Sequence, residues 1–597
     1  MGDLIAFDGY ENATAPFKEH EHKVHYKSSR QYLDFQIKNT KVDCQYPRFW
    51  DQTGVRVNQS VYESLGTQCY DSDFDHYGDT EAFGVFPDWQ RSLAKFASVQ
   101  DRLRDWRESV RKRLEVFSCI TVEMLDIDGF RYDKATQITV DALAEHNKVV
   151  RECAANVGKD NFFMPGEITG GNAYGSIYLG RGRQSDQKPK DAAKVLNWTT
   201  ANAPDTNFIR EKGTNALDAA AFHYSVYRLL TRFLGMDGNL EAGYDTPPDW
   251  VFMWDEMIVS NDLINPNTGK FDPRHQLGTT NQDVFRWPAI KQGVERMLLG
   301  QFITTIHMPG APLVYYGEEQ AMYVLDSTAE NYIFSRQAMS ASPAWMLHGC
   351  HAQNSTQYVG WPVDKARIGC QDETVSYDHR DPSHPVRNIM KAMYAMRDNY
   401  PGLQEGWLLQ HLSNKTDSII LPGSQGQPAK DGNPAVQPTP TIRGVWSVVR
   451  AFWPGVQDQF ASNPVWLVYH NYDEERSYTF DCSKADDGLI APFVEKTVVK
   501  NLFYPYDEHT LLGNPSKPLG IGGVEGPNGC LDKITMRAFE YRAYVEKANW
   551  RGPPPMVTKF TPGHDASVAS ADTVRIAFEF SEAVSYTHLT LPTILRV

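Results

Sequence analysis

Three acidic residues are the strongest candidates for chemistry in this chain: Asp133, Glu167 and Asp283. Asp133 closes the run Ile-Asp-Gly-Phe-Arg-Tyr-Asp over residues 127–133, in which Arg131 stands two positions before it. Because side chains alternate along a β-strand, Arg131 and Asp133 should point to the same side. A nearby cation keeps a carboxylate ionised, and glycoside hydrolysis uses an ionised, positioned carboxylate as its nucleophile.

The other two acids could complete such chemistry. Retaining glycosidases need a second carboxyl that holds a proton and passes it to the leaving oxygen. Glu167 follows the short apolar run 162–164 and suits that role. Asp283, in Thr-Asn-Gln-Asp, would orient sugar hydroxyls and favour the charged transition state. A single acid of this kind is more often a cap or a surface charge, so the interpretation depends on the ordered set.

The ordered motifs resemble those of the α-amylase superfamily, glycoside hydrolase family 13. The matching segments lie at 129–133, around Glu167, at 281–283 and at 310–319. The resemblance covers about residues 1–548. It implies that Asp133 is the nucleophile, Glu167 the general acid and base, and Asp283 the stabiliser of the transition state.

A narrower resemblance is to the extracellular amylase-like domain of fungal cell-wall α-1,3-glucan synthases. It rests on Asp-Gly-Phe-Arg-Tyr-Asp-Lys-Ala-Thr-Gln, Gly-Glu-Ile-Thr-Gly-Gly-Asn and Gly-Thr-Thr-Asn-Gln-Asp-Val-Phe-Arg-Trp. Gln137 and Gln282 stand where many amylases carry histidine, and glutamine cannot carry a proton charge. With the acids intact, this indicates an altered sugar site, although neutral drift is the alternative. The predicted substrate-binding residues are Arg131, Gln137, Asn281 and Gln282.

Three functional hypotheses follow, and all three take an α-glucan oligosaccharide or polysaccharide as the partner. The first is a transglycosylase within an α-1,3-glucan synthase, which passes a glucan chain from an Asp133 ester to another sugar hydroxyl. The second is a secreted hydrolase of α-1,4-glucan, in which water takes the chain. The third is a non-catalytic glucan-binding module, against which the intact acids argue. The sequence shows no glycine-rich phosphate cradle of the kind expected in a sugar-nucleotide transferase.

Composition indicates a sugar-handling protein of the secretory route. The formal net charge of −15 over 597 residues argues against nucleic acid or an anionic membrane surface as a partner. No apolar run is long enough to span a bilayer, so we expect membrane contact only through regions absent from this chain. The resemblance implies a place at the extracellular face of the plasma membrane or in the cell wall, with the full-length protein membrane-anchored. Five N-glycosylation sequons agree, at Asn12, Asn58, Asn197, Asn354 and Asn414.

Calcium is the one cofactor that the resemblance suggests, because many relatives bind it through Asp and carbonyl oxygens. The sequence shows no ligand cluster, so no metal-binding residue is predicted and no cofactor is certain. The eight cysteines include no Cys-x-x-Cys pair. In an oxidising compartment, Cys350 with Cys370 and Cys482 with Cys530 are the nearest candidate pairs; buried free thiols are the alternative.

The fold class predicted is α/β: a (β/α)8 TIM barrel, its N-terminal strands missing, with a loop-rich insertion and a C-terminal all-β domain. Apolar residues at helical spacing predict helices over 88–118, 138–156, 287–307 and 385–398. The apolar stretch Ile120–Leu125 is interpreted as a buried strand leading to Asp133. Residues 171–215 and 238–280 are expected to be long loops at the barrel mouth.

The domain boundaries follow from composition. We expect a loop-rich insertion over 1–85, the barrel over 86–421, a linker over 422–442, an all-β domain over 443–548, the start of a β-sandwich over 552–583 and a sequencing-adapter scar over 584–597. The first three barrel strands are expected upstream of the chain, which would make it a fragment of a longer product.

Overall fold

The computed structural model describes most of the chain after residue 108. Its described ranges are 74–75, 102–103, 108–168, 178–235, 249–321, 382–420, 438 and 440–581, with gaps at 136–137, 139, 182, 184–188, 201–203, 209–211, 285, 290–291, 458–462, 485, 519–526 and 562–574. The chain divides into two units. The first comprises Met1–Leu229 with Asp245–Leu277, and the second Leu230–Tyr244 with Gly278–Val597.

The first unit holds the segments that carry Asp133 and Glu167. Its elements are β1 Phe74–Asp75, β2 Arg102–Leu103, α4 Glu108–Leu125, α5 Val140–Asn156, β3 Pro165–Ile168, α7 Ala192–Thr200, η8 Asp205–Asn207, β4 Ala219–His223, the start of α8 Tyr224–Phe233, α9 Trp250–Ser260 and the start of β5 Gln276–Gly278. Strands β3 and β4 are parallel. Residues Gly129 and Tyr132 add parallel bridges to Phe163 and Gly166.

This order places three parallel segments side by side, each ending toward the same edge: 129–132, then β3, then β4. Helix α5 follows the first segment, and α8 follows β4 directly. Such repeated strand–helix units are what a parallel α/β fold requires. The described residues do not show a closed barrel, so the eight-stranded barrel stays a prediction.

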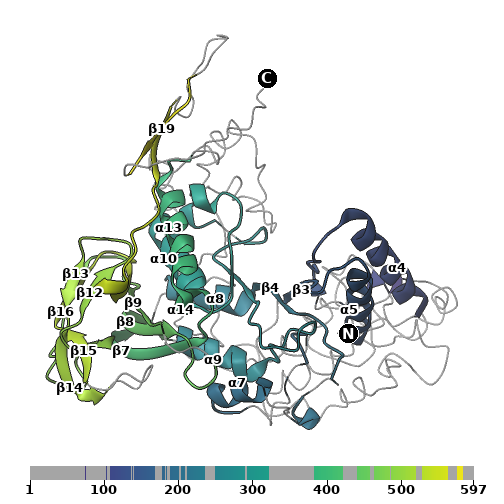
Figure 1. Ribbon diagram of the computed structural model, residues 1–597, viewed down its shortest axis with the longest axis horizontal. Coiled ribbons are helices and arrows are strands. Elements are labelled where there is room, and N and C mark those ends of the chain that lie inside the picture. Colours follow the sequence, from purple (N-terminus) through teal and green to yellow (C-terminus); the bar gives the residue numbers. More distant parts are fainter. Residues whose placement is uncertain are drawn as a thin grey trace, which may run out of the picture. The chain divides into compact units, whose positions relative to one another are not determined.

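The strand expected over Ile120–Leu125 is wrong, because these residues form the last turns of α4. The expected helix over 88–118 is also displaced: β2 lies at Arg102–Leu103 and the helix begins at Glu108. Val122 is buried while Met124 and Leu125 are exposed, which is the one-sided burial of a surface helix. Figure 1 shows α4 and α5 side by side, and the Cys119–Cys153 disulfide joins them. The sequence analysis did not foresee this pair.

The two long loops expected after Glu167 contain helices. Helix α7 lies within 171–215 and helix α9 within 238–280. Eight of the eleven residues of α9 are buried, so the helix is apolar on nearly every side and lacks the polar stripe that marks a surface helix. Asp249 begins it as an N-cap, its side chain accepting a hydrogen bond from the Phe252 amide.

The second unit begins with helices and continues as sheets. Its elements are η9 Trp287–Ala289, α10 Gly293–Phe302, the π-turn η10 Ile303–His307, β6 Ala311–Leu313, η11 Glu318–Gln320, α13 Pro385–Asn399, α14 Pro401–Gln404, β7 Leu408–Ile419, β8 Thr441–Ala451, β9 Val465–His470, β10 Arg476–Thr479, β11 Leu489–Val494, β12 Val498–Asn501, β13 Glu508–Thr510, β14 Leu512–Pro518, β15 Pro527–Leu531, β16 Lys533–Met536, β17 Tyr541–Glu546, η15 Lys547–Asn549, β18 Val557–Thr561 and β19 Ala577–Phe580. The helices expected over 287–307 and 385–398 are found as α10 with η10, and as α13.

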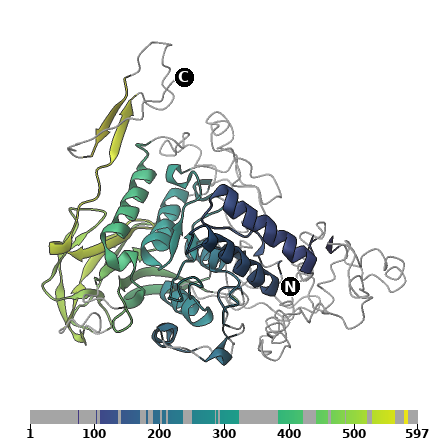
Figure 2. The same cartoon turned by 45° about the vertical axis from the view of Figure 1, so that its right-hand side comes forward.

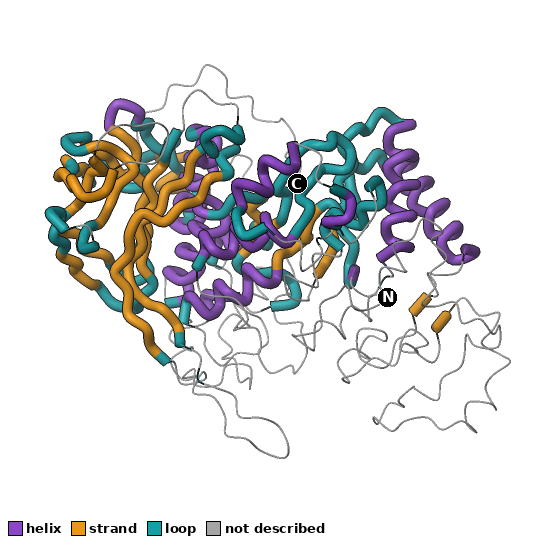
Figure 3. The backbone as a smooth tube through the Cα atoms, turned by 90° about the horizontal axis from the view of Figure 1, so that it is seen from below, coloured by secondary structure: helices purple, strands orange, loops and turns teal. Residues whose placement is uncertain are grey.

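Six antiparallel strands form the main sheet, in the order β13-β12-β17-β9-β8-β7. Figure 3 draws the strands in orange and shows several long ones running side by side. Its two faces follow from the alternation of side chains. Val445 and Trp466 point into an apolar core shared with β11, β15 and β16. Trp446 and Tyr469 point the other way, toward Phe233 and Phe302, so the helices pack on that face (Figure 2).

Strand β7 places the start of the all-β part earlier in the chain than expected. It pairs with β8 from Leu408 to Ile419, so the sheet starts well before the expected residue 443. Most of the expected linker 422–442 lies outside the described residues, and the strands on either side of it, β7 and β8, are paired with each other. Polar residues predominate in β7, and every position from Gln410 onward is half-buried or exposed, which hid the strand from a hydrophobic pattern.

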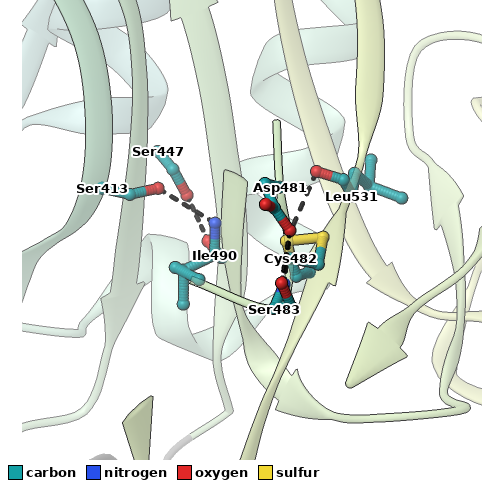
Figure 4. The surroundings of a disulfide bond; sticks show 8 residues. Ser413, Ser447, Asp481, Cys482, Ser483, Ile490 and Leu531 are labelled. Atoms are coloured by element: carbon teal, nitrogen blue, oxygen red, sulfur yellow. Dashed lines mark hydrogen bonds between the residues drawn. A yellow bond between two sulfur atoms is a disulfide. The ribbon is translucent and has the colours of Figure 1, made fainter. Parts of the chain in front are cut away.

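The Cys482–Cys530 disulfide forms as the sequence predicted, and it joins the residues after β10 to strand β15 (Figure 4). Next to it, the Ile490 amide donates to Ser413 Oγ at 2.9 Å, and Ser447 Oγ donates to the Ile490 carbonyl at 2.5 Å. These bonds link β7, β8 and β11 around the bridge. The other predicted pair, Cys350 with Cys370, lies outside the described residues.

Candidate active site

Backbone pairing fixes the segment that carries Asp133. The amides of Phe130 and Tyr132 donate to the carbonyls of Phe163 and Pro165, both at 2.9 Å, and the Glu167 amide donates to the Tyr132 carbonyl at 2.8 Å. A Cβ at Gly129 would collide with the Phe163 carbonyl, so only glycine allows this close approach. The pairing brings the end of 129–133 alongside the end of β3.

Because side chains alternate along a strand, those of residues 130–133 lie on two opposite sides. Phe130 and Tyr132 pack into a core with Phe162 and Met164, and the Tyr132 hydroxyl lies 3.1 Å from His146 Nδ1. Burial raises the pKa of Tyr132 far above its ordinary value. Arg131 and Asp133 point to the opposite side, as expected from their spacing.

Asp133 is held in its charged form. Arg131 Nη1 donates to Asp133 Oδ1 at 2.7 Å. Partial burial favours the neutral acid, but the hydrogen bond and charge of Arg131, with a hydrogen bond from Glu167, hold the pKa of Asp133 below its ordinary value. The Asp133 side chain is 62% exposed, so this carboxylate is both ionised and accessible.

Glu167 is the opposite case, a carboxyl that is 5% exposed and held from several sides. The Lys134 amide donates to its Oε2 at 2.9 Å, and the Tyr224 hydroxyl donates to its Oε1 at 3.1 Å. Arg131 Nη2 lies 3.9 Å from Oε2, so one guanidinium faces both acids. Lys134 adopts φ 47°, a left-handed turn that aims its amide at Glu167.

Tyr224 is a site residue that the sequence analysis missed. It is the first residue of α8, immediately after the fully buried strand β4. The run Ala219–His223 is the signal that could have revealed it, since a polar residue at the end of a buried parallel strand often belongs to a site. Position alone would not have linked it to Glu167, because that contact depends on the parallel pairing of β3 with β4.

Asp283 belongs to the second unit and is positioned by its own motif. The Asn281 side-chain oxygen accepts from the Asp283 amide at 2.7 Å, and Gln282 Nε2 donates to Asp283 Oδ2 at 3.1 Å. Asn281 is 4% exposed, while Gln282 and Asp283 are half-buried. Gln282 thus orients Asp283 through a hydrogen bond, without carrying a charge of its own.

A buried carboxyl, Glu318, supports the segment that leads to Asp283. Thr279 Oγ1 donates to Glu318 Oε1, and Gln301 Nε2 lies 3.1 Å from Thr279 Oγ1. The Tyr315 amide donates to Glu318 Oε2 at 2.8 Å, and the Trp287 indole donates to the Thr279 carbonyl at 2.8 Å. Burial raises the pKa of Glu318 to about 7, against the opposing hydrogen bonds.

The structure therefore brings together Arg131, Asp133 and Glu167, and separately Asn281, Gln282 and Asp283. Gln137 lies outside the described residues. Within the described ranges, no three His, Cys, Asp or Glu side chains converge as a metal site would require. In the same ranges, no helix has both the length and the apolar character needed to cross a bilayer.

Two family models match the C-terminal part of the chain. Residues 407–550 match the family model "Mok13-like, GH beta-sandwich domain", and residues 552–593 match "Mok13, Ig-like beta-sandwich domain". The first match begins one residue before β7, in agreement with the pairing of β7 and β8. The second match ends at residue 593 and so includes most of the segment 584–597 that we expected to be an adapter scar.

Similarity to curated proteins extends over nearly the whole chain. The relatives include the cell wall α-1,3-glucan synthases mok13, mok11 and ags1 of Schizosaccharomyces pombe, which are 44%, 43% and 39% identical over 99%, 98% and 98% of this chain. The chain spans 24% of the length of each. It is thus homologous to one segment of fungal cell-wall α-1,3-glucan synthases, which confirms the narrower resemblance seen in the motifs.

Solved structures with related arrangements include amylases. An Anoxybacillus α-amylase is 13% identical, with a TM-score of 0.38 over 75% of this chain and 65% of its own. The protein AmyP in complex with maltose is also 13% identical, with a TM-score of 0.37 over 75% of this chain and 68% of its own. Similarity at this level does not establish a shared fold.

Proposed function

We propose that this chain is the amylase-like part of an α-1,3-glucan synthase and acts on α-glucan by a retaining mechanism, with transfer of a glucan chain as its outcome. The observation that carries the proposal is the pairing of an ionised, exposed Asp133 with a buried, firmly held Glu167 under one guanidinium, Arg131. The homology to α-1,3-glucan synthases supports the choice of α-glucan. The (β/α)8 barrel is part of the same proposal.

In the first step, an Asp133 carboxylate oxygen attacks the anomeric carbon of a glucan. The bond from that carbon to the glycosidic oxygen breaks, and Glu167 gives its proton to the leaving oxygen. Glu167 lies beside the ionised Asp133 and is itself buried, which suits a carboxyl that holds a proton. Tyr224 and the Lys134 amide donate hydrogen bonds to Glu167 and hold its carboxyl in one orientation for proton transfer.

In the second step, the Glu167 carboxylate takes the proton of an acceptor hydroxyl. That oxygen attacks the anomeric carbon and releases Asp133 as a carboxylate. A sugar hydroxyl as acceptor lengthens a chain, and water shortens it. Asp283 would orient sugar hydroxyls, with Asn281, Gln282, Gln137 and Arg131 as further sugar contacts.

The location follows the same proposal: the extracellular face of the plasma membrane or the cell wall, where the relatives' names place their product. Calcium stays a prediction from family resemblance. No residue is assigned to it.

The test is the length of the products. The chain, secreted from a eukaryotic host, is incubated with short α-1,4- and α-1,3-linked gluco-oligosaccharides, and products are read by mass spectrometry. Products longer than the substrate support transfer; products that are only shorter make the enzyme a hydrolase of the same mechanism.

Asp133→Asn tests the nucleophile in the same assay. We expect a loss of turnover of at least about 1000-fold with oligosaccharide binding retained, because the amide cannot form the covalent ester. The matched control is Asp128→Asn, since Asp128 is 91% exposed and pairs with Lys159 rather than with either acid. Equal turnover of Asp133→Asn and wild type would overturn the assignment.

A further inference from the structure

A cavity of about 1200 Å³ lies in the first unit, away from the two acids. Its lining includes Lys159 and Asp160, which precede β3, whereas Glu167 stands near the carboxyl end of that strand. None of Arg131, Asp133 and Glu167 lines it. The cavity therefore opens at the other end of the parallel strands and is large enough for several sugar rings.

A loosely matched ion pair lies in its wall. Arg183 and Asp262 side chains are 1% and 6% exposed, and their nearest nitrogen and oxygen atoms are 4.0 Å apart, beyond hydrogen-bond distance. Arg183 Nε donates to the Asn261 carbonyl at 3.2 Å, but its Nη1 has no hydrogen-bond partner among the described residues. Burial raises the pKa of Asp262, although the charge of Arg183 opposes that effect.

Such a pair is expensive to bury unless its remaining donors and acceptors are satisfied. The guanidinium offers N–H donors, and the carboxylate beside it offers acceptor oxygens. A hydroxyl group donates and accepts at once, so a ligand with neighbouring hydroxyls satisfies both partners together. An anion would satisfy Arg183 but would face the Asp262 charge directly.

Three other cations around the cavity have acid partners: Arg181 pairs with Asp205 at 3.0 Å, Arg151 with Asp218 at 2.6 Å, and Lys159 with Asp128 at 2.7 Å. Lys148 and Lys212 also line the cavity, as do the acids Glu152 and Asp160. The lining therefore carries charges of both signs and is not a one-sign anion pocket. Arg181 also stacks on the Phe208 ring, at 4.1 Å from its centroid, which holds the wall in place before a ligand arrives.

We propose that this cavity is a second carbohydrate site, which binds a neutral oligosaccharide through its hydroxyls at Arg183 and Asp262. That the oligosaccharide is an α-glucan rests on the proposed function. Such a site would hold a glucan chain on the enzyme without taking part in bond cleavage.

Isothermal titration with maltoheptaose tests the site, in an Asp133→Asn background that prevents consumption of the ligand. We expect two sites per chain. Ala155→Trp places an indole in the cavity from an exposed position of α5 and should leave one. Asn156→Trp, next to it but outside the lining, is the matched control and should keep two. Maltoheptaose binding that Ala155→Trp leaves unchanged would overturn the proposal.

Two further measurements separate the ways in which the proposal can fail. Asp262→Asn should weaken the second site about tenfold or more, because it removes a charged acceptor while keeping the shape; an unchanged affinity counts against the role of Asp262. The same titration is repeated with inorganic phosphate. If the protein binds phosphate instead of maltoheptaose, and Ala155→Trp abolishes that binding, the cavity is an anion site and the proposal is wrong. If the protein with Asp133 intact fails to turn over oligosaccharides while Ala155→Trp still removes maltoheptaose binding, the proposed function fails and the cavity site stands.

Discussion

Glu318 is the residue whose charge depends most clearly on the fold. It is 2% exposed, and burial raises its pKa to about 7 from a usual value of 4.5. Because the folded state binds the proton more tightly than the unfolded state, the contribution of Glu318 to stability is fully present below pH 4.5 and is lost as the pH rises through about 7. Ionisation would also place a charge beside Thr279, two residues before Asn281.

Glu318→Gln should remove this pH dependence. We expect the free energy of unfolding of the wild type to fall, relative to the variant, by on the order of 3 kcal/mol between pH 4.5 and 7. Urea denaturation at several pH values measures the difference. Glu319→Gln, which removes a half-buried carboxylate on the same turn, is the control. Parallel curves for wild type and Glu318→Gln would contradict the prediction.

At the scale of elements, two disulfides secure different parts of the chain. Cys119–Cys153 ties α4 to α5, and α5 follows the segment that carries Asp133. Cys482–Cys530 lies inside the sandwich, between the regions of β10 and β15. Each bridge should therefore stabilise mainly its own surroundings.

Replacing Cys119 and Cys153 together by Ser should lower the local stability of α4 and α5 by about 2–4 kcal/mol, because the unfolded loop is no longer constrained. Hydrogen exchange measures this locally. The amides of α4 and α5 should exchange faster, while those of β8 and β9 stay unchanged. The Cys482→Ser, Cys530→Ser protein should show the reverse pattern. Equal acceleration in both regions would argue against separate roles.

For the molecule as a whole, the predicted route through the secretory pathway can be tested at one exposed sequon. Asn414 lies in the edge strand β7, and its side chain is exposed. Together with Lys415 and Thr416 it forms a sequon, and the disulfides within the described part agree with an oxidising compartment.

Secretion from a eukaryotic host should therefore add a glycan at Asn414. Mass spectrometry of the peptide that contains Asn414 would show the added mass. Thr416→Ala should abolish it, while Thr416→Ser, which preserves the sequon, should retain it. An unmodified Asn414 in the wild type would refute the prediction.

Local patterns in the sequence predicted the candidate reactive residues and the elements with regular periodicity. The spacing of Arg131 and Asp133 placed both on one side of a strand, because alternation is a property of the backbone itself. Helices α5 and α13 were predicted from apolar residues at helical spacing, which is likewise a local property of the chain. The Cys482–Cys530 pair was among the nearest candidates in sequence.

Only the tertiary structure decided the rest. The run Ile120–Leu125 is apolar enough for a strand, but the packing of α4 on α5 made it helical. Helix α9 gave no stripe because it is buried on nearly all sides. Tyr224 reaches Glu167, and Arg183 lies near Asp262, only because parallel strands and distant loops bring them together. Contacts between residues far apart in sequence leave no local pattern, and the burial that sets the pKa of Glu318 is likewise a property of the folded chain.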